Sequence, residues 1–276
     1  MCGRYASAKD PDALVEEFGV EECLVGKPGK PDKPLHADYN VAPTKRVYAV
    51  LSRQPEGAAE EAAAERQLRI VRWGLVPSWA KDPSIGSQMI NARSETVAEK
   101  PSFRRAFGKR RCLLPADGYY EWYTPTGDNV PLTSRGKPVK QPFYIHRADG
   151  HSLAMAGLYE WWHDKSCERD DPDAWLLTAT IITTSATDAV GRIHDRMPVV
   201  IAESDWQQWL DPTVGERDVI EQLMVPAQSS QLAAYPVSVR VNSVRNNGPE
   251  LVDPLPLEEA APGTVDADGL WPPADS

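Results

Sequence analysis

The residues of this chain that could do chemistry begin at its second position. Cys2 follows the initiator Met, and a residue as small as Cys usually allows that Met to be removed. Removal would leave an α-amine beside the thiol, groups whose ordinary pKa values are about 7.7 to 8.0 and about 8.5. Such a 1,2-aminothiol condenses with an aldehyde to an imine and then closes a thiazolidine ring. The same terminus would equally serve an N-terminal-nucleophile hydrolase, in which the thiol attacks an amide.

Two further stretches offer acid–base groups. In ADGYYEWY, strand alternation places Glu121 between two tyrosines on one face, so it is either an exposed strand residue or a proton-transfer group in an aromatic-lined pocket. Glu160 in GLYEWW has a similar setting, and composition does not separate the two. His194 in RIHDRMPVV stands beside Asp195 and Arg196, where imidazole can shuttle protons near neutrality and guanidinium can hold a phosphate. A lone histidine of this kind is more often structural.

A fourth stretch, INARSET, supplies an amide in Asn91 and a guanidinium in Arg93. Two tryptophans precede it in RWGLVPSWAKD. Trp73 lies inside an apolar run and is expected in the core, whereas Trp79 follows a Pro-Ser pair and is expected to be exposed. An exposed indole offers a stacking face worth about 1 to 3 kcal/mol per base in single-strand binders.

Charge is unevenly distributed along the 276 residues. The net charge is −10, which would repel a phosphate backbone, but residues 249–276 carry seven acids and no Lys or Arg. Between residues 69 and 111 ten Lys or Arg face three acids, a net of +7. A local basic patch on an acidic protein is the electrostatic signature of a nucleic-acid site, although a solvated helix face would look the same.

Several classes of protein are disfavoured. The four cysteines are widely separated and contain no C-x-x-C, so the sequence predicts neither a disulfide framework nor a metal site. His163 and Cys167 stand four apart, but in a polar stretch typical of a solvated loop. We expect no cofactor. No apolar run reaches membrane length and no leader is apparent, so we expect a cytoplasmic protein without a membrane contact.

Strand-like runs dominate the chain, and turn residues separate them. They cover residues 47–51, 68–76, 112–123, 142–147, 152–162, 175–185, 198–202 and 235–241. Helical spacing is predicted for 10–18, 203–210 and 216–224. Residues 54–66 and 124–141 have the composition of surface insertions, and the acidic, Pro/Ala-rich residues 252–276 that of a disordered tail. We therefore predict an α+β fold with a β-barrel-like core and a few flanking helices, in one domain over residues 1–251.

Seven motifs in a fixed order resemble the SOS-response-associated peptidase (SRAP) family, the abasic-site processing proteins. They are MCGRY at the start, YNVAPT (39–44), WGLVPSW (73–79), INARSET (90–96), ADGYYEW (116–122), IHDRMPVV (193–200) and PVSVRVNSVRNNG (236–248). The resemblance runs from Cys2 to about Leu251 and implies a single α+β domain that crosslinks to abasic sites in single-stranded DNA through its N-terminal cysteine. The family often has two successive aromatics where this chain has Trp79 and Ala80.

The resemblance also implies roles for individual residues. Cys2 is expected to be the crosslinking nucleophile, Asn91 to position the N-terminus and the sugar, Glu121 to transfer protons and His194 to act as the acid. The DNA contacts it implies are Arg4, Trp79, Arg93 and Arg196. It selects Glu121 over Glu160.

The implied activity is capture of an abasic site as a thiazolidine, with latent lyase activity. Met1 is removed beforehand either by an autopeptidase step, as the family's name implies, or by a separate aminopeptidase. The expected partner is single-stranded DNA containing abasic sites, bound by a monomer near the nucleoid, with replication or repair proteins as further partners. Two alternatives stay open at this point: an amidohydrolase, which leaves the basic patch unexplained, and a noncovalent single-strand binder, which leaves Cys2 without a role.

Overall fold

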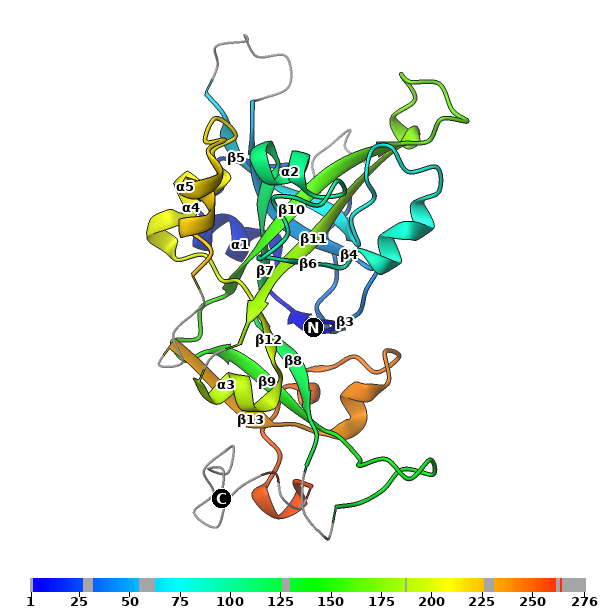
Figure 1. Ribbon diagram of the computed structural model, residues 1–276, viewed down its shortest axis with the longest axis vertical. Coiled ribbons are helices and arrows are strands. Elements are labelled where there is room, and N and C mark those ends of the chain that lie inside the picture. The colour runs from blue at the N-terminus through cyan, green and yellow to red at the C-terminus, as the bar shows by residue number, and fades with distance from the viewer. Residues whose placement is uncertain are drawn as a thin grey trace.

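The computed structural model of the protein describes residues 2–26, 32–54, 63–125, 130–186, 188–225, 231–261 and 264. Its strands are β1 (Tyr5–Ser7), β2 (Glu22–Cys23), β3 (Asp38–Val41), β4 (Arg46–Arg53), β5 (Glu65–Trp73), β6 (Asn91–Arg93), β7 (Arg111–Ala116), β8 (Gly118–Tyr123), β9 (Gln141–Arg147), β10 (Leu153–His163), β11 (Trp175–Ser185), β12 (Arg196–Pro198) and β13 (Leu232–Pro236). Its α-helices are α1 (Pro11–Glu17), α2 (Arg104–Lys109), α3 (Asp188–Ile193), α4 (Trp206–Leu210) and α5 (Arg217–Gln222). Figure 1 shows their arrangement.

Five of the strands close into a barrel. β11 pairs with β10, β10 with β7, β7 with β4 and β4 with β5, all antiparallel. β5 returns to β11 in a short parallel pairing that sets Thr178 opposite Arg72. Closure of this kind removes sheet edges that would otherwise pair with other chains. The predicted α+β fold with a barrel-like core is confirmed.

Alternate residues of these strands fill the barrel with apolar side chains. The buried inward residues include Ala49, Trp73, Leu114 and Ala179, which come from β4, β5, β7 and β11 respectively. Trp73 is fully buried, as predicted, and its indole Nε1 donates to the Ile90 carbonyl at 2.9 Å. This hydrogen bond satisfies the one polar group that the ring brings into the core.

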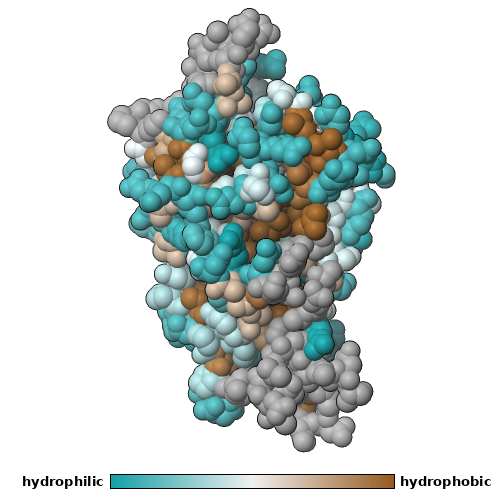
Figure 2. Space-filling model, turned by 90° about the vertical axis from the view of Figure 1, so that its left-hand side faces the viewer, coloured by the Kyte–Doolittle hydropathy of each residue, from teal (hydrophilic) through white to brown (hydrophobic). Residues whose placement is uncertain are grey.

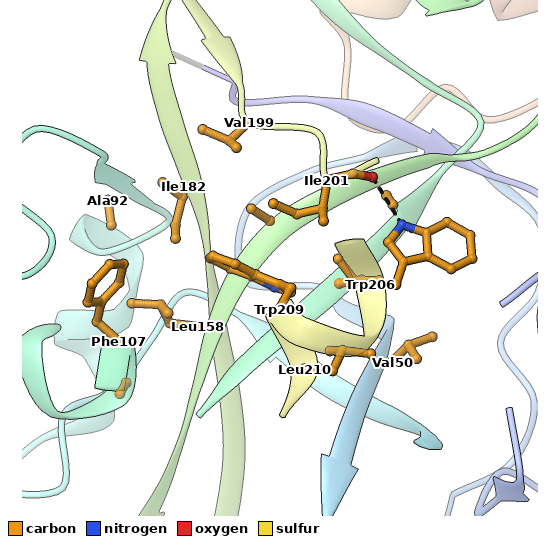
Figure 3. Packing of buried hydrophobic residues seen from close by; sticks show 14 of the residues in the cluster. Val50, Ala92, Phe107, Leu158, Ile182, Val199, Ile201, Trp206, Trp209 and Leu210 are labelled. Carbon is orange, nitrogen blue, oxygen red and sulfur yellow. Dashed lines mark hydrogen bonds between the residues drawn. The ribbon is translucent and has the colours of Figure 1, made fainter. Parts of the chain in front are cut away.

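The opposite faces of the same strands are covered by helices. In Figure 3, the Trp209 ring of α4 points toward Ile182 and Leu158, Leu210 lies beside Val50, and Phe107 of α2 lies beside Leu158. The Trp209 indole donates to the Cys112 carbonyl at 2.9 Å, which ties α4 to β7. α1, α2, α4 and α5 therefore lie outside the barrel, whereas α3 lies beside the second sheet, as Figure 1 also shows.

A second sheet, in the order β13-β9-β8-β1-β3, lies below the barrel in Figure 1. The chain passes from barrel strand β7 to β8 through Asp117 alone, whose carboxylate accepts a hydrogen bond from the Ala8 amide at 2.6 Å. β1 is held between β8 and β3, with Tyr5 opposite Tyr119. This pairing brings the N-terminal segment to the junction of the barrel and the second sheet.

Most predicted elements are present with shifted ends, and three predictions are wrong. The single strand predicted at 112–123 is two strands, β7 and β8, which belong to different sheets because the chain turns at Asp117. The predicted strand at 235–241 ends at Pro236, because the Ser238 side chain caps a 3-10 turn, η5 (Val239–Asn242). The predicted strand at 198–202 is instead β12, which ends at Pro198. The short strands β1, β2, β3 and β6 and the helices α2 and α3 were not predicted.

The regions predicted as insertions and tail are described in part. Residues 55–62 and 126–129, within the predicted insertions, and 265–276, within the predicted tail, lie outside the described residues. Past Leu251, the Leu255 amide donates to the Pro236 carbonyl at 2.8 Å, and the Ala261 amide to Gln141 Oε1 at 3.1 Å. Contacts with the second sheet therefore continue beyond the predicted domain boundary.

The surface of the described part is mixed in character. Figure 2, which looks onto the side where α4 and α5 lie, shows mainly hydrophilic side chains with hydrophobic patches between them. None of the helices in the described part of the chain has the length and apolarity that a membrane span requires.

Candidate functional site

Cys2 lies at the junction of the two sheets and is fully buried. Its carbonyl accepts a hydrogen bond from Asn91 Nδ2 at 2.8 Å. Asn91 begins β6, which is fixed to the barrel by its parallel pairing with Ile181 of β11. The Asn91 Oδ1 atom is also buried and has no hydrogen-bond partner among the described residues. Asn91 therefore fixes the Cys2 backbone and keeps an acceptor available for a further donor.

Glu121 stands on β8, two residues beyond Tyr119, and its side chain faces the same junction. It is only 2% exposed. Burial raises the pKa of Glu121 to about 8, because a carboxylate loses its hydration there. Near neutral pH this side chain is largely a carboxylic acid, able to donate a proton. The alternative of an exposed strand residue is excluded by its burial.

His194 follows α3 and faces Glu121, with 4.0 Å between His194 Nε2 and Glu121 Oε2. His194 Nδ1 accepts a hydrogen bond from the Arg196 amide at 3.0 Å, so the neutral ring carries its proton on Nε2, toward Glu121. Burial lowers the pKa of His194. Asp195 Oδ1 lies 2.9 Å from Nδ1 and would stabilise the ring if it became protonated.

The surroundings of the Cys2 thiol are apolar and aromatic. Burial is the main cause that raises the pKa of the Cys2 thiol, and the nearby Glu121 carboxyl group raises it further. The hydroxyls of Tyr5 and Tyr119 are buried and have no hydrogen-bond partner among the described residues. Burial also raises the pKa of both tyrosines. The thiol is therefore neutral in this state of the protein, and charges in the site interact strongly because water is excluded.

The structure brings together the four predicted chemical residues but separates the predicted DNA contacts into two kinds. Arg93 and Trp79 are exposed, Trp79 by 55%. Arg4 is turned inward, donating to Asn40 Oδ1 at 2.7 Å and to the Val241 carbonyl at 2.9 Å. Arg196 donates to Glu95 Oε1 at 2.5 Å and is also engaged internally. The assignment of all four to DNA stays a prediction.

The position after Trp79 has a structural explanation. Ala80 is 3% exposed and packs against Trp162, whose indole donates to the Ala80 carbonyl at 2.8 Å. The Trp162 ring fills the space in which an aromatic residue at position 80 would have to lie. Next to Trp79 the chain therefore has a small residue, Ala80, against which the Trp162 ring of β10 packs.

One member of the predicted basic patch is a core residue. Arg111 is 2% exposed and its guanidinium donates to the backbone carbonyls of Phe107, Trp209, Asp211 and Val214. Glu160 is likewise engaged, since its carboxylate accepts from Arg110 at 2.5 Å and from the Trp161 amide at 3.0 Å. Glu160 lies at the far end of β10, away from Cys2.

Metal ligation has no support in the described part of the chain, where no group of three or more His, Cys, Asp or Glu side chains is placed to hold an ion.

Comparison with known proteins identifies the fold and its motifs. Residues 1–244 match the family model described as SOS response associated peptidase (SRAP). The chain belongs to the SRAP family. Abasic site processing protein YoqW of Bacillus subtilis (strain 168) is 37% identical over 254 residues, covering 92% of this chain and 99% of that protein. Abasic site processing protein HMCES of Gallus gallus is 34% identical over 298 residues, covering 97% and 81%.

A solved structure agrees with the assignment. A crystal structure of a protein from Bacteroides thetaiotaomicron matches this SRAP chain with a TM-score of 0.73 at 25% identity. The match covers 92% of this chain and all of the other. The barrel and the second sheet thus recur in a related solved protein.

The structure also shows what two other SRAP motifs do here. Asn40, from YNVAPT, is fully buried and its amide donates to the carbonyls of Val241, Ser243 and Asn246, all from the last motif. Its Oδ1 accepts from Arg4. Sequence reasoning missed Asn40 as a residue that holds the N-terminal segment, and its place in a short polar motif outside any strand-like run was the available signal.

Proposed function

We propose that this SRAP protein senses abasic sites in single-stranded DNA and captures them as a thiazolidine through Cys2 after removal of Met1. The printed names of its relatives, abasic site processing proteins, support the substrate. We further propose that the protein acts as a monomer at damaged DNA in the cell, together with replication or repair proteins.

One observation carries the chemistry. Cys2 has its carbonyl fixed by Asn91, in a buried junction that also holds a protonated Glu121 and a neutral His194. An amine, a thiol and two proton carriers are what imine formation and ring closure require. Neither group of the aminothiol needs a cofactor for these steps.

The first step joins the Cys2 amine to the sugar. An abasic deoxyribose exists as a closed hemiacetal and an open aldehyde, and only the aldehyde reacts with an amine. As the hemiacetal opens, the C1′ hydroxyl proton passes to the ring oxygen, to which His194 Nε2–H donates a hydrogen bond. The amine nitrogen then adds to C1′ and one of its protons passes to the former aldehyde oxygen. The Glu121 carboxyl protonates the resulting hydroxyl, water leaves, and the second nitrogen proton returns to Glu121 to give the neutral imine.

The second step removes the imine. The Cys2 sulfur adds to C1′ and its proton passes to nitrogen, which closes the five-membered ring. An imine left in place acidifies the C2′ protons, and loss of one of them expels the 3′ phosphate and breaks the strand. Ring closure therefore protects the strand, whereas lyase activity stays latent.

Removal of Met1 has to come first, because the Cys2 nitrogen is an amide until then. We propose that the same residues assist this hydrolysis, as the name of the family implies. The alternative function, an amidohydrolase that uses Cys2 as a nucleophile on other substrates, is less consistent with the site. Burial raises the pKa of the thiol, and a hydrolase nucleophile works as a thiolate.

We propose that four residues contact the strand: Arg4, Trp79, Arg93 and Arg196. Arg93 and Trp79 are accessible to a strand, and their guanidinium and indole offer a phosphate contact and a stacking face. We propose that Arg4 and Arg196 contribute positive potential from their internally paired positions.

A denaturing gel tests the proposal. Purified protein incubated with a single-stranded oligonucleotide that contains one abasic site should give a heat-stable band of higher mass, and the intact mass of active protein should lack Met1. An oligonucleotide with a reduced, aldehyde-free abasic site is the control. Absence of the band with the aldehyde substrate would rule out covalent capture and leave only noncovalent binding.

A further inference from the structure

A second groove lies at the end of the barrel opposite Cys2. It has a volume of about 490 Å³, and it is lined by side chains from α2, from the end of β10 and from the start of β11. Its charged and aromatic lining residues include Arg105, Arg110, Lys165, Arg169, Trp161 and Trp175. None of these residues takes part in the chemistry at Cys2.

One wall of the groove is strongly basic. From Lys100 to Arg111 the chain carries six Lys or Arg and no acid, and Arg105 is among the exposed ones. Arg110 is paired with Glu160, the acid that lines the groove. Residues 164–173, in the connection between β10 and β11, add Lys165 and Arg169 to the lining of the groove. The same stretch contains five acids, and none of them lines the groove. The cations that face the groove therefore outnumber the acids.

The groove has an aromatic floor as well. Two of its lining residues, Trp161 and Trp175, meet edge-on with 6.5 Å between their ring centroids. The guanidinium groups of Arg53 and Arg69, which do not line the groove, lie 5.8 and 6.0 Å from the Trp161 ring. The Trp161 Nε1 atom is buried and has no hydrogen-bond partner among the described residues. Cations above aromatic faces are the combination that holds a single nucleic-acid strand without regard to its sequence.

The groove is joined to the reaction site by one stretch of chain. Ser78 lines the groove, the exposed Trp79 follows it, and the stretch ends at Asn91 beside Cys2. In Figure 1 this cyan stretch runs along one flank of the barrel, beside β10 and β11. Along β11, Trp175 and Ile181 are about 20 Å apart at about 3.3 Å per residue. A few nucleotides would span that distance.

We propose that this groove binds the undamaged part of the same DNA strand, on one side of the abasic site, so that the DNA footprint extends from Cys2 past Trp79 to Trp161. The inference rests on the proposed function for its substrate but concerns a site that takes no part in the reaction. The ligand chemistry is that of single-stranded DNA: phosphates on the cations of α2 and bases on the tryptophans.

Binding of undamaged single-stranded DNA, measured by fluorescence anisotropy, tests the proposal without any covalent step. The test variant is Arg105→Ala with Lys165→Ala, and Arg135→Ala, an exposed arginine in the connection before β9, is the matched control. Losing two phosphate contacts should reduce the slope of log affinity against log salt by about 1.4, at about 0.7 per contact. We expect affinity for a long strand to fall about tenfold and affinity for a strand too short to reach the groove to stay unchanged.

Crosslinking separates this inference from the proposed function. At saturating abasic DNA the double variant should crosslink at the wild-type rate, because its substitutions lie at the far end of the barrel. An unchanged affinity and salt slope for the long strand would overturn the inference, as would a loss confined to double-stranded DNA. If wild type binds the long strand through the groove but forms no crosslink, the proposed function fails and the groove assignment stands.

Discussion

The nitrogen and the sulfur of Cys2 carry separate steps, so one substitution distinguishes them. In Cys2→Ala the α-amine should survive Met1 removal, because Ala is also small, and an imine should still form at the abasic aldehyde. Without sulfur the imine persists, and we expect strand breakage by β-elimination where wild type protects the strand. Borohydride should reduce the imine to a stable adduct, and a denaturing gel measures the fraction of strand that is cleaved. A heat-stable crosslink in Cys2→Ala without reductant would contradict the thiazolidine mechanism.

The protonation state of Glu121 should be visible in the pH dependence of crosslinking. The carboxyl has a pKa raised to about 8, so its acid form is present below that pH and is lost as pH rises through it. The Cys2 amine reacts only when neutral, and its ordinary pKa of about 7.7 to 8.0 gives a rate that rises with pH. Together they predict a bell-shaped profile near pH 8.

Glu121→Gln provides the comparison for that profile. The amide cannot donate its proton as an acid, so we expect a rate about 100-fold lower and loss of the descending limb, while the rising limb from the amine stays. Single-turnover rates from pH 6 to 9.5 measure both limbs. A descending limb at the same pH in the variant would show that another group supplies the proton.

At this scale the sequence indicated four candidate chemical residues that the structure brings together: Cys2, Asn91, Glu121 and His194. Arg4 and Arg196 looked equally available in the sequence, but their partners, Asn40 and Glu95, stand far away along the chain. Pairing between distant residues leaves no local signal, so their internal engagement could not be predicted.

Among the elements, strands with many β-branched residues were predicted well and short strands were not. β11 agrees with its predicted bounds, 175–185, because its run of Thr, Ile and Leu is long. β1 and β6 have three residues each and exist through pairing with neighbours that the sequence does not reveal. These two short strands nevertheless carry the supports of the site, since β1 follows Cys2 and β6 begins with Asn91.

The loop that carries Trp79 allows a paired test of surface and core. In Trp79→Ala an exposed ring is lost, so affinity for single-stranded DNA should fall by about 1 to 3 kcal/mol while thermal stability is unchanged. In Ala80→Trp a large ring is forced against Trp162, which should destabilise the fold by about 1 to 3 kcal/mol. Anisotropy and thermal melting measure the two effects.

The opposite result would correct the account of position 80. If Ala80→Trp melts at the wild-type temperature and binds DNA more tightly, the second aromatic can reach the strand, and Trp162 does not occupy its place. Such a variant would show that the loop after Val76 can rearrange to expose both rings.

For the molecule as a whole, closure of the barrel was the least predictable feature. The composition indicated a sheet or barrel, but closure depends on the short parallel pairing of β5 with β11 between residues about a hundred positions apart. The charge pattern was more informative. It indicated a basic surface between residues 69 and 111, and the exposed cations of α2 agree, although Arg111 at its end is buried.

Two truncations separate the folded end of the molecule from its acidic remainder. Ending the chain after Leu251 removes the hydrogen bonds that Leu255 and Ala261 make with the second sheet, and it removes Thr264, which is fully buried. At about 1 kcal/mol for each lost hydrogen bond, we expect destabilisation of about 2 kcal/mol and a melting temperature several degrees lower.

Ending the chain after Thr264 removes only residues 265–276, which contain three acids and no Lys or Arg. Because the acidic, Pro/Ala-rich composition of this segment predicts disorder, we expect an unchanged melting temperature and an intact crosslink. Equal melting temperatures for the two truncations would place the end of the folded domain at Leu251, as the sequence had indicated, and would assign no stability to the contacts beyond it.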